Sequence, residues 1–122
     1  MSYEVYLIEA TDDHSWNVLE SKNRIQEGGT QMVGGSKECH LNITVNYSDM
    51  YYKIFPDELG LHWLQSKTAK ETEEVLTSAV KILGTERADN YWSKTMGNAG
   101  YALWILLGWA KEIPEGRWSV HN

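Results

Sequence analysis

The segment from His40 to Ser48 constrains the fold most, because polar and apolar residues alternate along it without a break. In a strand, successive side chains point to opposite faces of the sheet. One face would carry apolar residues into a core, namely Leu41, Ile43, Val45 and Tyr47. The other face would present an uncharged polar row, formed by His40, Asn42, Thr44, Asn46 and Ser48. This row is either the solvent-facing side of an antiparallel sheet or the floor of a polar binding site.

Other parts of the first half also favour strands. Residues 3–8 are rich in β-formers, and residues 117–120 at the far end of the chain fit a short edge strand. We expect the alternating strand itself to run from Cys39 to Ser48. Glycine pairs at 28–29 and 34–35 indicate turns on both sides of a short piece. Residues 49–56 carry three aromatic rings and are expected to form a helical turn or an aromatic loop, which Pro56 ends.

The second half contains the signals of a well-defined helix. Thr68 and Glu71 have the spacing of a capping box, in which each side chain bonds to the backbone of the other residue. Gly84 stands where such a helix would end. Between these signals, apolar residues recur at helical spacing and predict one buried stripe: Val75, Leu76, Ala79, Val80 and Leu83.

A second helix is predicted from Thr95 or Asn98 to Glu112, with Pro114 just beyond its end. No charged residue occurs between Lys94 and Lys111, and apolar residues surround the predicted helix on all sides. Such a helix is either the central helix of the core or one that also buries a face in a homo-oligomer through residues 98–111. It is shorter than the run of about 20 apolar residues that crossing a membrane requires.

The order of these elements predicts the α+β class. Strands come first and helices follow, so we expect a small antiparallel sheet with two main helices packed on one face. A length of 122 residues fits a single domain that spans residues 1–122.

The charge of the chain narrows the kind of partner. Asp and Glu number 17 against 11 Lys and Arg, which gives a formal charge of −6. This balance disfavours nucleic acid and anionic membranes as partners, and it suits a basic partner protein. Cys39 is the only cysteine, and the N-terminus lacks a basic region followed by an apolar run, so we expect a cytoplasmic protein without a secretory signal.

Two groups of residues are candidates for a ligand-binding site. Asn42, Thr44 and Asn46 on the polar row would read the edges of a sugar or nucleobase. The start of the second helix offers free backbone N–H groups that attract a phosphate or carboxylate. Four nearby residues would complete this cradle, and the rings of Tyr91 and Trp92 would stack on the ligand; the cradle residues are Lys94, Thr95, Gly97 and Asn98. The structural alternative is that Thr95 or Asn98 caps the helix while the two rings pack against it.

Signals for metal binding or catalysis are weak. The four histidines stand at positions 14, 40, 62 and 121, without the spacing of a metal site, so no metal and no cofactor are expected. A small hydrolase or transferase that uses Asp12, His14 or His40 remains an alternative, although nothing marks a nucleophile.

Several motifs together resemble a family of small phage and prophage proteins to which no activity is attached. The resemblance covers roughly Ser2 to Trp118, and residues 50–70 depart from the family's pattern. The motifs that carry it are Gly28-Gly29-Thr30 with Val33-Gly34-Gly35, Leu41 to Ser48, Tyr91-Trp92 with Thr95 and Gly97-Asn98-Ala99, and Pro114-Glu115-Gly116 with Trp118. The resemblance implies a role in a bacterial host's cytoplasm during infection or lysogeny. By analogy with small acidic phage proteins, it also implies an antagonist of a host or defence system.

These observations lead to one principal hypothesis about function. The chain would be a phage-derived, non-catalytic binding protein, and one role that such a protein could have is that of a counter-defence factor. It would bind a host or defence protein or sequester a small nucleotide-like molecule. The alternatives are a small hydrolase or transferase, and a structural, oligomeric phage accessory protein.

Overall fold

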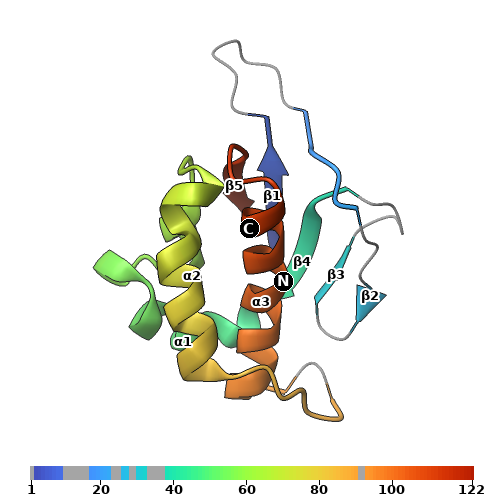
Figure 1. Ribbon diagram of the computed structural model, residues 1–122. Helices are drawn as coiled ribbons and strands as arrows, with labels where there is room; N and C mark the ends of the chain where they lie inside the picture. Colours follow the sequence, from blue (N-terminus) through green and yellow to red (C-terminus); the bar gives the residue numbers. More distant parts are fainter. Residues whose placement is uncertain (1, 10–16, 23–25, 28–29, 33–37, 91–92) are drawn as a thin grey trace.

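The computed structural model describes residues 2–9, 17–22, 26–27, 30–32, 38–90 and 93–122. Its five strands form one antiparallel sheet in the order β2-β3-β4-β1-β5 (Figure 1). Strand β1, near the start of the chain, lies between β4 and the last strand, β5. The strands are β1 (Ser2–Ile8), β2 (Gln26–Glu27), β3 (Thr30–Met32), β4 (His40–Thr44) and β5 (Arg117–His121).

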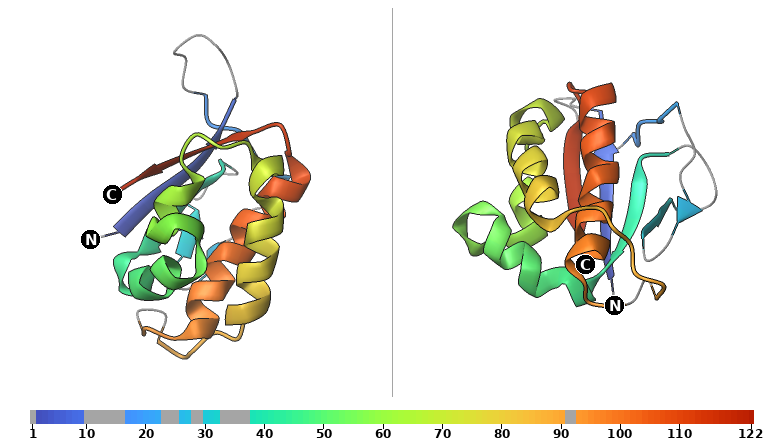
Figure 2. Two further views of the ribbon diagram at one scale, coloured as in Figure 1. Left: turned by 90° about the vertical axis from the view of Figure 1, so that its left-hand side faces the viewer. Right: turned by 60° about the horizontal axis from the view of Figure 1, so that its bottom comes forward.

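The helices follow β4 in the chain and cover one face of the sheet. Helices α2 and α3 pack side by side, and the sheet and the helices form two layers in Figure 2. The predicted α+β class, with two main helices on one face of an antiparallel sheet, is confirmed. The helical elements are η2 (Val45–Tyr47), α1 (Ser48–Ile54), η3 (Pro56–Glu58), η4 (Gly60–Leu64), α2 (Ala69–Leu83) and α3 (Met96–Glu112).

Strand register separates the residues of the sheet into two faces. Tyr3 pairs with Ile43 and Leu7 pairs with Trp118, and these side chains are buried beneath the helices. The alternate residues form the outer face, away from the helices. These outer residues include Ser2, Glu4, Tyr6, His40, Asn42, Thr44, Ser119 and His121.

The alternating segment is a strand for only half of its predicted length. Strand β4 ends at Thr44, and the chain then turns through η2 into α1, so the strand predicted through Ser48 is wrong from Val45 onward. The Thr44 hydroxyl accepts the Asn46 backbone N–H at 3.3 Å, and the Ser48 hydroxyl donates to the Val45 carbonyl at 2.7 Å. These local bonds give the backbone an alternative to the sheet ladder.

Both predicted helices are present with the expected ends. The capping box of Thr68 and Glu71 opens α2, and Gly84 follows its last residue with a positive φ of 77°. Helix α3 begins at Met96 with Thr95 as its N-cap, and most of its circumference is buried. Among the described residues, none of the helices has the length and apolar character needed to cross a membrane.

Candidate functional site

Asn42 lies on the outer face of the sheet, where neighbours on β1 bind its side chain. Its Nδ2 donates to the Ser2 hydroxyl at 2.8 Å and to Glu4 Oε1 at 2.7 Å. Both amide hydrogens are therefore engaged within the sheet. Any ligand at Asn42 would have to use its carbonyl oxygen or displace one of these bonds.

The polar row that includes Asn42 reaches Thr44, the partner of Ser2, but does not continue to Asn46. Thr44 is buried and its hydroxyl caps η2, while Asn46 is exposed within η2 itself. The row breaks because the strand ends at Thr44, so the period of two no longer sets side-chain direction. A ligand role for these residues stays a prediction.

Thr95 and Asn98 lie together at the start of α3, as predicted, but their polar atoms bind the chain itself. The Thr95 hydroxyl accepts the Asn98 backbone N–H at 3.1 Å. The buried Asn98 side chain accepts the Ala88 N–H at 2.9 Å and donates to the carbonyls of Asn90, at 3.2 Å, and Ser93, at 3.0 Å. These contacts fit the capping alternative. Tyr91 and Trp92, whose rings were predicted to stack on the ligand, lie outside the described residues.

The outer face of the sheet carries a cluster of rings around one carboxylate. The Nε2 atom of His40 lies 2.5 Å from Glu4 Oε2, and the His40 ring stacks on Tyr6 with centroids 3.9 Å apart. His121 meets Tyr6 edge-on, and its Nε2 lies 2.8 Å from the Ser119 hydroxyl. We call Glu4, Tyr6, His40 and His121 the outer-face cluster. Partial burial, together with the carboxylates of Glu4 and Glu38, raises the pKa of Tyr6.

The outer-face cluster has part of the geometry of a catalytic base. A carboxylate that bonds one ring nitrogen of a histidine fixes the tautomer and the orientation of the ring. His40 has such a carboxylate in Glu4, and its side chain remains 12 % exposed. Asp12 and His14, the other residues of the hydrolase alternative, lie outside the described residues.

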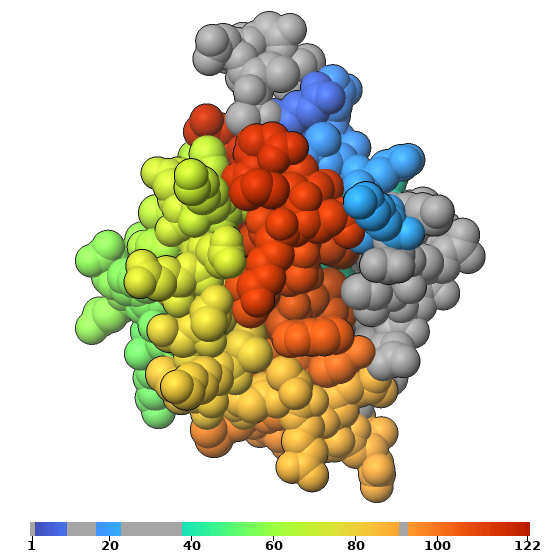
Figure 3. Space-filling model, in the orientation of Figure 1, coloured from blue at the N-terminus to red at the C-terminus, as the bar shows by residue number. Residues whose placement is uncertain are grey.

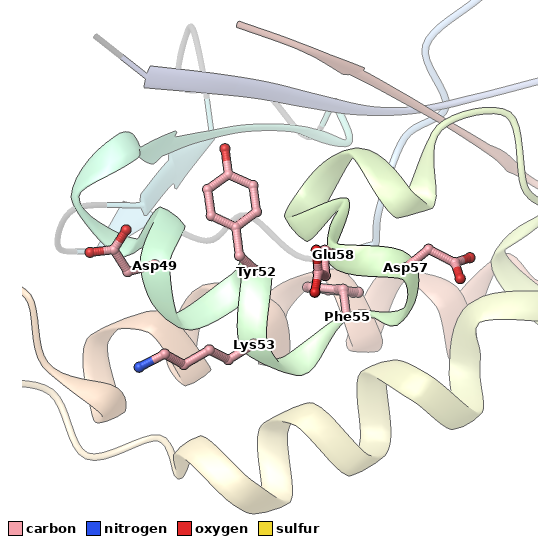
Figure 4. A pocket seen from close by; sticks show the side chains of 6 residues that line it. All are labelled: Asp49, Tyr52, Lys53, Phe55, Asp57 and Glu58. Atoms are coloured by element: carbon pink, nitrogen blue, oxygen red, sulfur yellow. The ribbon is translucent and has the colours of Figure 1, made fainter.

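A groove of about 760 Å³ opens where α1 meets η3 (Figure 4). Asp49 and Asp57 lie toward its opposite ends, with Tyr52 and Phe55 between them. We call it the α1–η3 groove. Its lining residues are Asp49, Tyr52, Lys53, Phe55, Asp57 and Glu58.

Unusual backbone geometry shapes one wall of the groove. Pro56 follows the extended residue Phe55, and Asp57 and Glu58 then adopt positive φ values of 61° and 58°. Left-handed conformations cost non-glycine residues about 1–3 kcal/mol each, and they persist only where the surroundings enforce them. Strain of this kind is concentrated at functional sites, so this turn supports a binding role for the groove.

Tyr52 forms an exposed aromatic surface in the groove. The residue is 46 % exposed, and its ring packs closely against the backbone at Gly60. A Cβ atom at position 60 would lie 2.7 Å from the Tyr52 Cδ1 atom, and the φ of 61° there also favours glycine. Leu59 is 48 % exposed in the same turn. An aromatic ring held in place and still open to solvent is suited to contact a partner.

The charges of the groove are mainly negative. Asp49 binds the ammonium of Lys94, and this hydrogen bond and charge lower the pKa of the Asp49 carboxyl. Asp57 and Glu58 are exposed, and within the described part of the chain neither forms an ion pair. Lys53 supplies one positive charge. The groove therefore attracts positively charged groups more than phosphates.

The groove was not among the sites predicted from the sequence. The rings of residues 49–56 were expected in a helical turn or an aromatic loop, and α1 shows the helical form, but no binding role was assigned to them. The sequence signal that points to the groove is Pro56-Asp57-Glu58-Leu59-Gly60, where proline and glycine enclose two acids and an apolar residue. Such a segment is typical of a tight, exposed turn.

The described residues contain no cluster of three or more His, Cys, Asp or Glu side chains placed to hold a metal ion. No family model matches the chain, and neither a curated protein nor a solved structure matches it.

Proposed function

We propose that this chain is a non-catalytic binding protein that engages a partner protein through the α1–η3 groove. The observation that carries the proposal is the open groove itself, which is lined both by the exposed ring of Tyr52 and by Asp57 and Glu58 of a strained turn. Aromatic rings and well-placed charges are the usual components of a protein-binding surface.

The chemistry of the groove favours a basic segment as the part of the partner that is bound. A Lys or Arg side chain would meet the carboxylates of Asp57 and Glu58, and a second cation of the same segment would be attracted to the face of Tyr52. The formal charge of −6 strengthens this attraction at long range. The same charges repel phosphates, so a partner protein is favoured over a nucleotide-like ligand.

The resemblance to small phage proteins supports a host or defence protein as the partner. Binding alone is enough to antagonise such a target, since an inhibitor acts by covering the surface that the target needs. A counter-defence role in the cytoplasm of a bacterial host is the biological form of the proposal.

Binding of a fluorescein-labelled hexa-arginine peptide, followed by fluorescence anisotropy, tests the groove. The double variant Asp57→Asn/Glu58→Gln should bind roughly tenfold more weakly at low salt, since each exposed charge pair contributes about 1 kcal/mol or less. The control Asp89→Asn/Glu115→Gln removes two exposed carboxylates elsewhere and should change the affinity less than about twofold. Equal weakening by both pairs would show non-specific attraction and contradict the proposal.

One contact favours a second candidate, the small hydrolase or transferase. The His40–Glu4 pair at 2.5 Å resembles a general base and the carboxylate that orients it. Turnover of p-nitrophenyl acetate or bis(p-nitrophenyl) phosphate tests this candidate. Activity that disappears in a folded His40→Gln variant would favour it, and activity that is absent or unchanged would exclude His40 as the base for these substrates.

A further inference from the structure

The charges of the α1–η3 groove differ between its two ends. Asp57 and Glu58 of η3 supply two exposed carboxylates, and within the described part of the chain neither forms an ion pair. The other charged residues that line the groove, Asp49 and Lys53, come from α1. In Figure 4 the side chains of Lys53 and Asp57 point in opposite directions. The cation of α1 and the free acids of η3 therefore lie on different sides of the groove.

Two ammonium groups share a single carboxylate at the α1 end. Asp49 binds the ammonium of Lys94, and Lys53 stands four residues after Asp49, where side chains are neighbours on a helix surface. The hydrogen bond and charge of Lys94, and to a smaller extent the charge of Lys53, lower the pKa of the Asp49 carboxyl. Among the lining residues and Lys94, the α1 end therefore keeps one positive charge in excess, whereas η3 presents two negative charges.

Both ends of the groove are accessible to a partner. Figure 3 shows the segment around η3, in green, projecting at the left-hand edge of the molecule, outside α2 in yellow. Lys53 is exposed as well. Because Lys53 and Asp57 are four residues apart in the chain, their Cα atoms are separated by at most about 14 Å. An extended segment of about five residues covers such a distance.

We propose that the groove binds a partner segment whose charges are separated, with basic side chains at the η3 end and an acidic side chain at Lys53. The inference rests on the proposed function and specifies the charge pattern of the bound segment. A carboxylate of the partner would compensate the excess cation of α1, whereas a uniformly basic segment would bring a like charge to it. Opposite charges at the two ends also fix which way round the segment lies, because the reversed placement sets like charges against each other.

Competition against the fluorescein-labelled hexa-arginine peptide at low salt tests this charge pattern. Two unlabelled peptides with blocked ends share one composition and carry no net charge: Arg-Arg-Gly-Gly-Glu-Glu, with separated charges, and Arg-Glu-Gly-Gly-Glu-Arg, with mixed charges. The separated peptide should displace the label at a concentration about threefold lower, since each exposed charge pair contributes modestly and is screened by salt. The reversed peptide Glu-Glu-Gly-Gly-Arg-Arg is measured too, because side-chain charges alone do not set chain direction, and the tighter of the two separated peptides is compared.

Lys53→Gln gives the most specific readout, because it should change two affinities in opposite directions. The separated peptide should bind about twofold more weakly and lose its advantage over the mixed peptide, since its acidic end no longer meets an excess cation. Hexa-arginine should bind more tightly, since a like charge has been removed. The control Lys111→Gln removes an exposed lysine in the last turn of α3, at the far end of that helix from Lys94, and should leave the ratio of the two peptides unchanged.

The results separate this inference from the proposed function. Equal displacement by separated and mixed peptides, with hexa-arginine binding still weakened by Asp57→Asn/Glu58→Gln, would overturn the charge pattern and leave the acidic groove as the site. Hexa-arginine binding that does not respond to Asp57→Asn/Glu58→Gln would overturn both. A preference for the separated peptide that persists in Lys53→Gln would contradict the role of Lys53. Urea unfolding of Lys53→Gln checks its fold, which a change at an exposed position should preserve.

Discussion

A buried side-chain hydrogen bond ties the last strand to α2. The Trp118 indole Nε1–H donates to the Thr72 hydroxyl at 2.8 Å, and that hydroxyl donates in turn to the Ala69 carbonyl at 2.9 Å. Replacing Thr72 with valine keeps the shape of the side chain but leaves the indole N–H without an acceptor. An unsatisfied buried donor costs about 1–3 kcal/mol, so Thr72→Val should lower the free energy of unfolding by that amount.

Urea denaturation measures this effect, and Thr77→Val on the same helix is the matched control. The Thr77 hydroxyl donates to the Glu73 carbonyl at the surface, where water can replace it. The control should therefore change stability by no more than about 0.5 kcal/mol. Equal losses in the two variants would show that helix propensity, and not the bond to Trp118, is responsible.

Cys39 illustrates how burial controls reactivity at the scale of a single residue. Burial raises the pKa of its thiol to about 12, and the nearby carboxylates of Glu112 and Glu20 add to the shift. The thiolate is the reactive form, so alkylation by iodoacetamide at pH 8 should be roughly a thousandfold slower in the folded chain than in urea. A folded-state rate close to that of a free thiol would contradict the burial of Cys39.

The same shift predicts how stability depends on pH. In the unfolded chain the thiol ionises near its ordinary value of 9.0, whereas in the folded chain it stays protonated until about pH 12. The unfolded state therefore loses its proton first as pH rises. Stability from this group is complete below about pH 9 and declines between pH 9 and 12. A Cys39→Ala variant should show a smaller decline in the urea midpoint over this range.

At the scale of elements, the sequence predicts best where the signals are local. The capping box of Thr68 and Glu71 and the apolar stripe that follows it up to Gly84 act within a few turns of one another, and α2 forms as predicted. The sequence did not predict the end of β4, because the alternating pattern continues unbroken to Ser48. In the structure, the hydroxyls of Thr44 and Ser48 bind nearby backbone groups, and these bonds replace strand pairing after Thr44. A periodicity shows which face is apolar, but it does not show where the strand ends.

Small residues at the start of α3 have a role that the sequence did not reveal. A Cβ atom at Gly97 would lie 1.7 Å from the Glu86 carbonyl oxygen, and one at Gly100 would lie 1.8 Å from that of Gly84. The segment that leaves α2 therefore crosses directly over α3, and Asn98 binds the same segment through Ala88. The motif around Gly97-Asn98-Ala99 is explained by this packing, independently of any ligand.

Gly100→Ala is the variant that tests this crossing. The added methyl group would displace the backbone at Gly84, so we expect a loss of about 3 kcal/mol or more in the free energy of unfolding. Gly108→Ala lies on the open side of the same helix and should instead stabilise the chain by up to about 1 kcal/mol. A mild effect of Gly100→Ala in urea denaturation would show that the crossing segment moves aside easily.

At the scale of the whole molecule, composition and element order were enough to predict the α+β class. The candidate site was not predictable in the same way. The α1–η3 groove depends on left-handed turns at Asp57 and Glu58 and on the packing of Tyr52 over Gly60, and neither follows from periodicity. Conversely, Asn42 and Asn98 were expected to bind a ligand because they are polar, and the fold uses their side chains for bonds within the chain.

The most direct test of the proposed function is an NMR footprint. The ¹⁵N-labelled chain would be titrated with the hexa-arginine peptide while every assigned amide signal is followed. The proposal predicts shifts confined to the α1–η3 groove, at Tyr52, Lys53, Asp57 and Glu58, and their loss in Asp57→Asn/Glu58→Gln. Shifts centred on His40 and His121 of the outer-face cluster, or spread evenly over all acidic residues, would contradict it.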